Sequence, residues 1–359
     1  MSQSKANLYS LLPEEVVNLC NSINEPKFRA VQIFTQLHSK NKTLDEMTNI
    51  GKDTKRKLSE LSFCELPKVE QKFVSALDGT IKYLFSLSDG NCIESVLMKY
   101  KHGNTLCIST QVGCRMGCAF CASTIGGRVR NLDAGELIGQ IISTERDSGE
   151  NISNVVMMGI GEPLDNYENV IKFLKLVNHS QGKNIGYRHI SLSTCGVVDK
   201  IYELAKENLP ITLSISLHAC DDKTRSMIMP INNRWNINEL LIACASYYQS
   251  TTRRISFEYT LIEGKNDSID EAHSLARLLN SKLRKDEKMP IHVNLIPVNT
   301  VNETGFISPS KDKISNFAKA LEAHGIRTTI RRKLGADIDA SCGQLRKAFS
   351  ENNSKANLK

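Results

Sequence analysis

The chain has 359 residues, of which 24% are charged and 40% hydrophobic, and its formal net charge is +7. This composition is typical of a globular protein, and it excludes a disordered chain, a collagen-like repeat and a coiled-coil rod. The sequence contains no apolar run of the roughly 18–20 residues that a membrane helix needs, and its start lacks the basic region and apolar core of a secretory signal. We therefore expect a cytoplasmic protein with no membrane partner. The mild positive excess permits an acidic partner such as RNA without demonstrating one.

The N-terminal part of the chain is predicted to be helical. Residues 14–62 contain two stretches with apolar side chains every three to four residues, and Pro26 separates them. We expect a small helical accessory domain over residues 1–66. Basic side chains surround the second stretch and form either a solvated face or a surface for RNA: Lys27, Arg29, Lys40 and Lys42.

A three-stranded meander is predicted to follow the helices. Two Asp-Gly pairs, at Asp78 and Asp89, interrupt runs of strand-forming residues, and Asp-Gly at such a place is a strong hairpin signal. The three strands are expected at residues 68–77, 80–88 and 92–100. We interpret residues 67–100 as a short β-meander linker between the helical domain and the main domain.

From about residue 103, strands and helices alternate along the chain. Strands are expected at 104–110, 154–160, 188–194, 211–217, 254–262, 291–298 and 326–332. Helices are expected at 134–147, 167–178, 198–207, 237–249, 269–282 and 310–324. Such alternation predicts a parallel sheet, and about six units suggest an α/β fold with a partial (β/α)6 barrel of the TIM type. We place this core at residues 101–345 and a flexible tail at 346–359; in such barrels functional residues gather at the carboxyl ends of the strands.

Three of the eleven cysteines form a CxxxCxxC group directly after the first barrel strand: Cys114, Cys118 and Cys121. Without a secretory signal the compartment is expected to be reducing, so clustered cysteines indicate a metal or redox site. Structural zinc prefers four closed ligands, usually from two pairs, and no second pair lies nearby. A [4Fe–4S] cluster normally takes four thiolates, so three would leave one iron open for a cofactor or substrate. The spacing, with an aromatic residue before the third cysteine, is the signature of the radical S-adenosylmethionine superfamily.

Further polar segments follow other strands of the predicted barrel. Gly161 and Glu162 come after the second strand, where a glycine lets a ligand approach the backbone and a carboxylate can accept bonds from an ammonium group. Ser193 ends the third strand, and Ser216 and His218 end the fourth. Hydroxyl and imidazole groups suit a ribose and an adenine edge.

The order of the motifs adds a resemblance that covers nearly the whole chain. Seven segments occur in sequence: QVGCRMGCAFCAST, MMGIGEPLDN, LSTCGVV, SISLHA, MPIN, NLIPVN and DIDASCGQLRKA. With them the chain resembles the RlmN family of radical S-adenosylmethionine methyltransferases. The resemblance implies formation of 2-methyladenosine at adenosine 2503 of 23S rRNA and adenosine 37 of tRNAs. It also implies one [4Fe–4S] cluster, two molecules of S-adenosylmethionine per turnover, and an electron donor such as flavodoxin or ferredoxin.

The resemblance also implies roles for individual residues. Cys342 matches the cysteine that carries the methyl group as S-methylcysteine, and Cys107 matches the one that forms a transient disulfide with it. Glu94 matches a residue assigned as proton acceptor, although Cys107 competes for that role and the sequence does not decide between them. The S-adenosylmethionine contacts are matched by Gly161, Glu162, Ser193, Ser216, Leu217, His218 and Asn299.

Three alternatives stay open at this point. A Cfr-type enzyme would methylate C8 of adenine and confer antibiotic resistance, but Pro163 after Glu162 fits the C2 enzymes better. An iron–sulfur or zinc protein could bind RNA without catalysis, which would leave Cys342 without a role. A radical enzyme could act on a peptide or small metabolite, which would leave the N-terminal helices unexplained.

Overall fold

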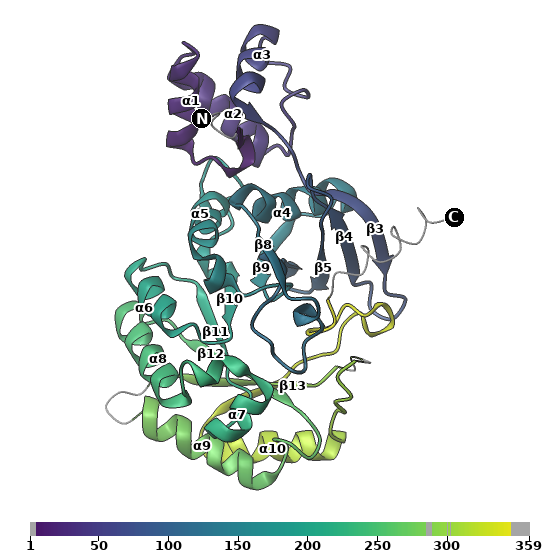
Figure 1. The fold of residues 1–359 in the computed structure, drawn as a ribbon, viewed down its shortest axis with the longest axis vertical. Helices are drawn as coiled ribbons and strands as arrows, with labels where there is room; N and C mark the ends of the chain where they lie inside the picture. The colour runs from purple at the N-terminus through teal and green to yellow at the C-terminus, as the bar shows by residue number, and fades with distance from the viewer. Residues whose placement is uncertain (1–4, 285–288, 300, 302, 346–359) are drawn as a thin grey trace.

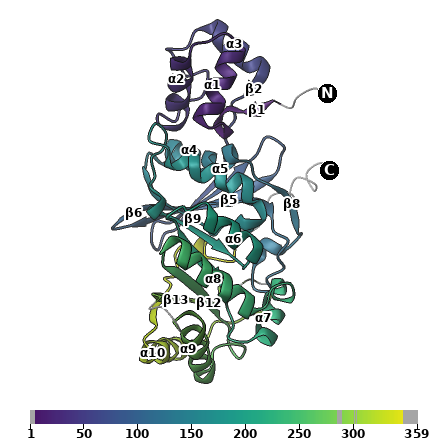
Figure 2. The same ribbon diagram turned by 90° about the vertical axis from the view of Figure 1, so that its left-hand side faces the viewer.

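The computed structural model describes residues 5–284, 289–299, 301 and 303–345. An N-terminal group of helices lies at one end of an elongated molecule, and the helices α9 (Ile269–Leu283) and α10 (Lys311–Ala323) lie at the other (Figures 1 and 2). The tail that we predicted at 346–359 is outside the described residues. None of the helices in the described part of the chain has the length and hydrophobicity that crossing a membrane requires.

The N-terminal region contains three helices, α1 (Pro13–Ser22), α2 (Lys27–His38) and α3 (Lys52–Leu61). Proline at the first position and two acidic residues in the first turn favour the start of α1. The short strands β1 (Ala6–Asn7) and β2 (Ser62–Phe63) pair in parallel and join the two ends of the region. The 3-10 turn η1 (Leu8–Ser10) attaches it to the core, because the Ser10 hydroxyl accepts from the Gly135 amide at 2.9 Å and donates to Asp133 Oδ1 at 3.0 Å.

The predicted meander is present as β3 (Lys68–Val74), β4 (Ile81–Ser86) and β5 (Cys92–Tyr100), all antiparallel. Gly79 and Gly90 follow the two aspartates with φ of 72° and 80°, the left-handed conformation that such turns require. The meander continues into the main sheet, because β5 pairs antiparallel with β6 (Gly103–Cys107). One ten-stranded mixed sheet results, in the order β14-β13-β12-β11-β10-β9-β6-β5-β4-β3.

The partial (β/α)6 barrel is confirmed. Seven neighbouring parallel strands form it: β6, β9 (Ile152–Met157), β10 (Ile190–Thr194), β11 (Thr212–Ser216), β12 (Ile255–Leu261), β13 (Ile291–Pro297) and β14 (Arg327–Ile330). The helices between them are α4 (Ala134–Ser148), α5 (Tyr167–Asn178), α6 (Val198–Lys206), α8 (Ile237–Thr251), α9 and α10.

Several short elements were not predicted, because a segment of only a few residues is too short to show a hydrophobic periodicity. They are α7 (Asp222–Ile228), the two-stranded sheet of β7 (Gln111–Gly113) and β8 (Arg128–Asn131), and the 3-10 turns η2 (Ala122–Thr124), η3 (Pro163–Asn166), η4 (Tyr187–His189), η5 (Pro230–Asn233) and η6 (Ala336–Ile338).

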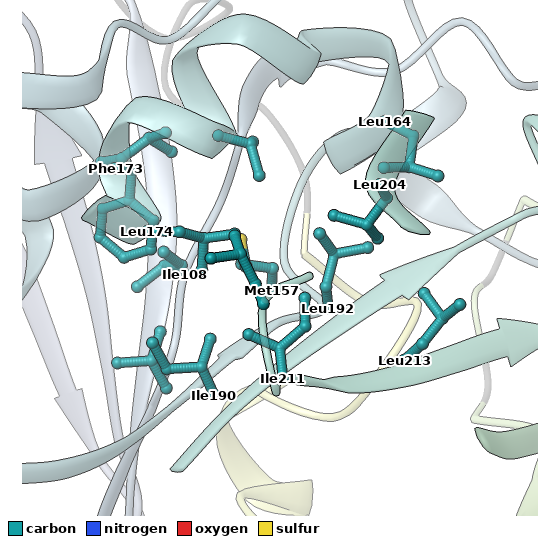
Figure 3. Packing of buried hydrophobic residues seen from close by; sticks show 14 of the residues in the cluster. Ile108, Met157, Leu164, Phe173, Leu174, Ile190, Leu192, Leu204, Ile211 and Leu213 are labelled. Atoms are coloured by element: carbon teal, nitrogen blue, oxygen red, sulfur yellow. The ribbon is translucent and has the colours of Figure 1, made fainter. Parts of the chain in front are cut away.

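The two faces of the barrel sheet differ in chemistry. Apolar side chains from the outer face, such as Leu192 and Leu213, pack under Phe173, Leu174 and Leu204 of the covering helices (Figure 3). Side chains alternate between the two faces of a strand, so Ser193 and Ser216, which alternate with these apolar residues, point to the inner face. Burial of the outer face against helices fixes the register of the strands, and this places polar side chains inside the barrel.

Candidate active site

The main cavity lies at the carboxyl ends of the barrel strands and brings most of the predicted site residues together. Ten of them line it: Cys114, Cys118, Cys121, Gly161, Glu162, Ser193, Ser216, His218, Asn299 and Cys342. The cavity therefore lies at the end of the barrel where functional residues are expected.

The three clustered cysteines lie on the loop between β7 and η2. Gly113 allows this loop to leave β7, because its φ is 73° and a Cβ there would come within 2.0 Å of the Gly127 carbonyl oxygen. The loop is anchored by the Ala119 amide, which donates to the Ile228 carbonyl at 2.9 Å. Burial is the main cause that raises the pKa values of these cysteines, to about 12 for Cys114, and for Cys118 the thiols of Cys121 and Cys114 add to it. Three close, buried thiols suit a bound metal centre, since coordination to a metal deprotonates a thiol.

A site for a single metal ion is less well supported than a site for a metal cluster. Among the described residues, no group of three or more His, Cys, Asp or Glu side chains is arranged to hold one metal ion. Besides Cys342 and the three clustered cysteines, Cys195 also lines the main cavity, and its backbone amide donates to Glu162 Oε2 at 2.8 Å. Cys195 was not among the predicted site residues, although its position directly after β10 was a usable signal.

Glu162 is a buried carboxylate that faces this cavity. It caps η3 by accepting from the Leu164 amide at 3.0 Å, and burial raises its pKa. In the described structure no lysine or arginine forms an ion pair with it. The preceding Gly161 has φ of 104°, and a Cβ there would lie 2.6 Å from Gln111 Cβ. An ammonium group would supply the positive charge that this buried carboxylate lacks.

His218 is held in one tautomer at the end of β11. Its Nδ1 accepts from the Thr260 amide at 2.8 Å, so the ring proton is on Nε2. Burial lowers its pKa to about 3, which keeps the ring neutral. Leu217 differs from the other predicted contacts, because its side chain is in the core and the residue does not line the cavity.

A second cavity adjoins the first and contains Cys107. Cys342 and Asn299 line both cavities, so Cys342 lies at their junction. Burial, and then the proximity of the Cys342 thiol, raise the pKa of Cys107 to about 12. Arg331 also lines both cavities and donates to Met158 Sδ at 3.5 Å. The pKa of this arginine is raised, mainly by the nearby sulfur of Cys342.

The backbone around Cys342 is tied to distant parts of the chain. We call residues 334–345 the C-terminal segment. Asn299 Nδ2 donates to the Cys342 carbonyl at 2.9 Å, and the Ala122 amide donates to the Gly343 carbonyl at 2.8 Å. At the other end of the segment, Asp337 accepts from the Ser75 hydroxyl at 2.7 Å and the Ala76 amide at 2.9 Å. Asp78 Oδ2 accepts from the Gly335 amide at 2.9 Å.

The structure does not bring Glu94 into either cavity lining. Its carboxylate lies on β5, is buried, and is 3.6 Å from Lys82 Nζ. Val96 and Met98, which share its side of β5 by alternation, do line the second cavity.

Sequence reasoning also missed Glu258 on β12, which lines the main cavity. Its two carboxylate oxygens accept from Ser256 Oγ at 3.0 Å and Asn294 Nδ2 at 2.7 Å. The available signal was the alternation of Ser256, Glu258 and Thr260 within an otherwise apolar strand.

Comparison with known proteins agrees with this geometry. A family model for the radical SAM superfamily matches residues 108–276, and one for the ribosomal RNA large subunit methyltransferase N-terminal domain matches residues 6–64. The "Probable dual-specificity RNA methyltransferase RlmN" of Clostridium novyi is 50% identical over 348 residues, covering 97% of this chain and 99% of that protein. The relative of the same name from Clostridium botulinum strain Eklund 17B is 52% identical over 343 residues, covering 96% and 97%.

The chain belongs to the RlmN family. A radical SAM methyltransferase from Sphaerobacter thermophilus has the same fold, with a TM-score of 0.89 and 40% identity over 95% of this chain and 99% of that one. The RlmN-type chain is thus a radical SAM RNA methyltransferase that uses a [4Fe–4S] cluster and S-adenosylmethionine, and the predicted family, fold class, enzyme class and cofactors are confirmed. The roles of individual residues stay predictions.

Proposed function

We propose that the enzyme forms 2-methyladenosine at adenosine 2503 of 23S rRNA and at adenosine 37 of tRNAs. The observation that supports this most is the position of Cys342, which lies between a cavity with three clustered cysteines and a cavity with Cys107. A methyl carrier must face its source on one side and its acceptor on the other.

In the main cavity, Cys114, Cys118 and Cys121 would hold the cluster. Glu162 would accept from the amino group of S-adenosylmethionine, and the neutral Nε2–H of His218 would donate to an adenine nitrogen. Ser193, Ser216, Asn299, Gly161 and the backbone of Leu217 would complete the contacts. When bound, these cofactors supply a carbon radical that can take a hydrogen atom from a methyl group, which is the difficult part of the chemistry.

Cys342 would accept a methyl group from a first molecule of S-adenosylmethionine, and a second molecule would be consumed in activating that group. A thiolate is a strong nucleophile, and Arg331 lines the same two cavities as Cys342. C2 of adenine is electron-poor and has no nucleophilic lone pair, so direct transfer of a methyl cation to it is unfavourable. A protein-bound carbon that adds to the ring avoids this difficulty.

Cys107 would release the product. The radical adduct would first lose the ring proton and one electron, and the oxidised cluster would be the acceptor of that electron. The Cys107 thiolate would then attack Sγ of Cys342, so that an S–S bond forms and the bond between sulfur and the transferred carbon breaks. The electron pair of that bond would remain on the carbon, which is then protonated. Its place in the second cavity also favours Cys107 over Glu94 as the base that removes the ring proton, because Glu94 lies beside Lys82 outside the lining.

The second cavity would receive the target base. Tyr100, Met158 and Val96 supply apolar walls, and the exposed Arg332 and Lys333 lie at the same cavity, where they can contact phosphates. We assign RNA binding to residues 1–66, a linking role to 67–100, the radical chemistry to 101–345 and no catalytic role to 346–359. A flavodoxin or ferredoxin would donate the electron, and the cytoplasm would be the site of action.

The decisive experiment is anaerobic reconstitution of the cluster, followed by reaction with 23S rRNA fragments and tRNA and by mass spectrometry of the nucleosides. We expect 2-methyladenosine in both RNAs. Formation of 8-methyladenosine would support the Cfr-type alternative, and a loaded protein that binds RNA but modifies neither substrate would support a non-catalytic role.

A further inference from the structure

A surface groove lies on the outer side of the loop that carries the clustered cysteines. Met116, between Cys114 and Cys118 in the sequence, lines both the main cavity and this groove. Gly117 packs closely against Pro230 in the groove wall, where an added Cβ would be 3.4 Å from Pro230 Cγ. The cysteine loop is therefore the partition between the cofactor cavity and this part of the surface.

The groove has the chemistry of a protein-docking site. Its lining includes Trp235, the only tryptophan in the chain, and the Arg234 guanidinium lies 4.2 Å from the centre of the Trp235 ring. Tryptophan and arginine are the residue types most often found at the energetic centres of protein interfaces. Apolar side chains of Val197 and Ile231 line the same groove.

The charge at the groove is positive. Arg115, whose side chain is 57% exposed, and Arg128 both form ion pairs with Asp165, so two guanidinium groups share one carboxylate. Arg234 adds an exposed positive charge for which the described residues provide no ion-pair partner. An acidic partner would be steered toward this surface.

The groove is also separate from the proposed RNA entrance. It shares no lining residue with the second cavity, where Cys107, Cys342 and Arg331 lie. A partner in the groove could therefore reach the cysteine loop while RNA and the C-terminal segment occupy the other side.

We propose that this groove is the docking site for an acidic one-electron carrier protein, which reduces the cluster through the thin partition at Met116. This rests on the proposed function in so far as that function names a flavodoxin or ferredoxin as the donor. One electron leaves the reduced carrier and enters the oxidised cluster, and no proton or group is transferred in this step.

The test uses the full-length holoenzyme and a bacterial flavodoxin that is kept reduced by its reductase and NADPH. Arg234→Glu and Trp235→Ala should slow the bleaching of cluster absorbance by reduced flavodoxin about tenfold, because charge steering and the aromatic contact are lost. Arg234→Lys should keep most of the rate, and the matched charge reversal Arg277→Glu, at an exposed position on α9, should leave it unchanged.

Dithionite provides the internal control, because a small reductant needs no docking surface. Its rate of cluster reduction should be equal in all variants, and so should their affinity for RNA. Unchanged reduction by flavodoxin in Arg234→Glu would overturn the proposal. Equal slowing with dithionite would mean that the groove only shapes the cysteine loop, and a loss of RNA affinity would assign the groove to RNA. Absence of 2-methyladenosine with a normal flavodoxin effect would contradict the proposed function but not this one.

Discussion

Cys342 has different neighbours on its two sides, and this makes its chemistry separable from that of Cys107. On one side are the clustered cysteines and Glu162, and on the other are Cys107 and Tyr100. If the two thiols have successive roles, then removing each of them should stop the reaction at a different stage.

We predict that Cys342→Ala leaves RNA unmodified and unattached, because it has no methyl carrier. Cys107→Ala should still form the bond between carrier and ring but should be unable to resolve it, so the protein stays covalently attached to RNA. Denaturing gels after turnover with labelled RNA distinguish the two outcomes. Inactivity without attachment in both variants would remove Cys107 from this role, and normal methylation by Cys342→Ala would contradict the whole mechanism.

Resolution by Cys107 should also depend steeply on pH. Burial raises the pKa of Cys107 to about 12, so the thiol is almost fully protonated at neutral pH. Below that pKa the thiolate fraction increases tenfold for each pH unit, because the deprotonated form is favoured as protons become scarce. We expect the decay of the covalent complex to accelerate about tenfold per pH unit between pH 7 and 9 in single-turnover experiments. A rate that stays constant over this range would show that Cys107 is not the attacking group.

At the residue level, the sequence was most informative where spacing alone defines chemistry. Cys114, Cys118 and Cys121 were recognisable because three thiols in eight residues have few structural explanations. Glu258 and Cys195 could not be assigned, since their importance depends on which face of a strand points inward, and that is settled only when the neighbouring strands are in register.

At the level of elements, the turn between β3 and β4 holds the C-terminal segment in place. Ser75, Ala76 and Asp78 of this turn bond to Asp337 and Gly335. Because these contacts lie only a few residues before Cys342, they limit the positions that its thiol can take.

We predict that the double variant Asp78→Asn, Asp337→Asn loosens the segment and exposes Cys342. Alkylation of Cys342 by iodoacetamide, followed by peptide mass spectrometry, should become several-fold faster, while methylation of RNA slows. Asp89→Asn is the matched control, because Asp89 occupies the equivalent turn between β4 and β5 but pairs with Arg130 instead. Equal alkylation of Cys342 in parent and double variant would argue against a positioning role for the turn.

Long amphipathic elements were predictable and short ones were not. The helix at 167–178 was expected with the bounds it has, since its apolar side chains recur over three turns. The seven-residue α7 and the three-residue β7 were missed, although both support the cysteine loop. Their conformation is set by contacts with that loop rather than by their own periodicity.

At the scale of the whole molecule, the N-terminal helices extend away from the barrel and carry exposed basic residues such as Lys27 and Lys40 (Figure 2). We predict that RNA affinity falls as salt increases, because phosphate contacts release counterions. The double variant Lys27→Glu, Lys40→Glu should weaken binding and reduce this salt slope by about two, since each lost contact reduces it by about one.

The same double variant should leave reductive cleavage of S-adenosylmethionine unchanged, because we assign that reaction to the barrel alone. The double variant Lys311→Glu, Lys319→Glu on α10, at the opposite end of the molecule, serves as the control for the same change in net charge. Filter binding at several salt concentrations measures all three proteins. Parent-like affinity and slope in the Lys27→Glu, Lys40→Glu variant would exclude this helical face as an RNA contact.

The arrangement of the meander was only partly predictable. Its strands and turns could be recognised locally, but the sequence does not show that β6 pairs with β5 on one side and with β9 on the other. This pairing depends on contacts between residues far apart in the chain, and it makes the strand of Cys107 an interior strand of the ten-stranded sheet.

The contact of the C-terminal segment with the turn after β3 has a consequence for synthesis in the cell. A ribosome releases the cysteine loop, the barrel strands and the β3–β4 turn long before it releases Cys342. A nascent or prematurely terminated chain could therefore fold most of the cofactor cavity without Cys342, the proposed methyl carrier. Such a chain would be able to generate a reactive radical with no acceptor beside it. Insertion of the cluster only after translation is complete would protect the cell from this incomplete form.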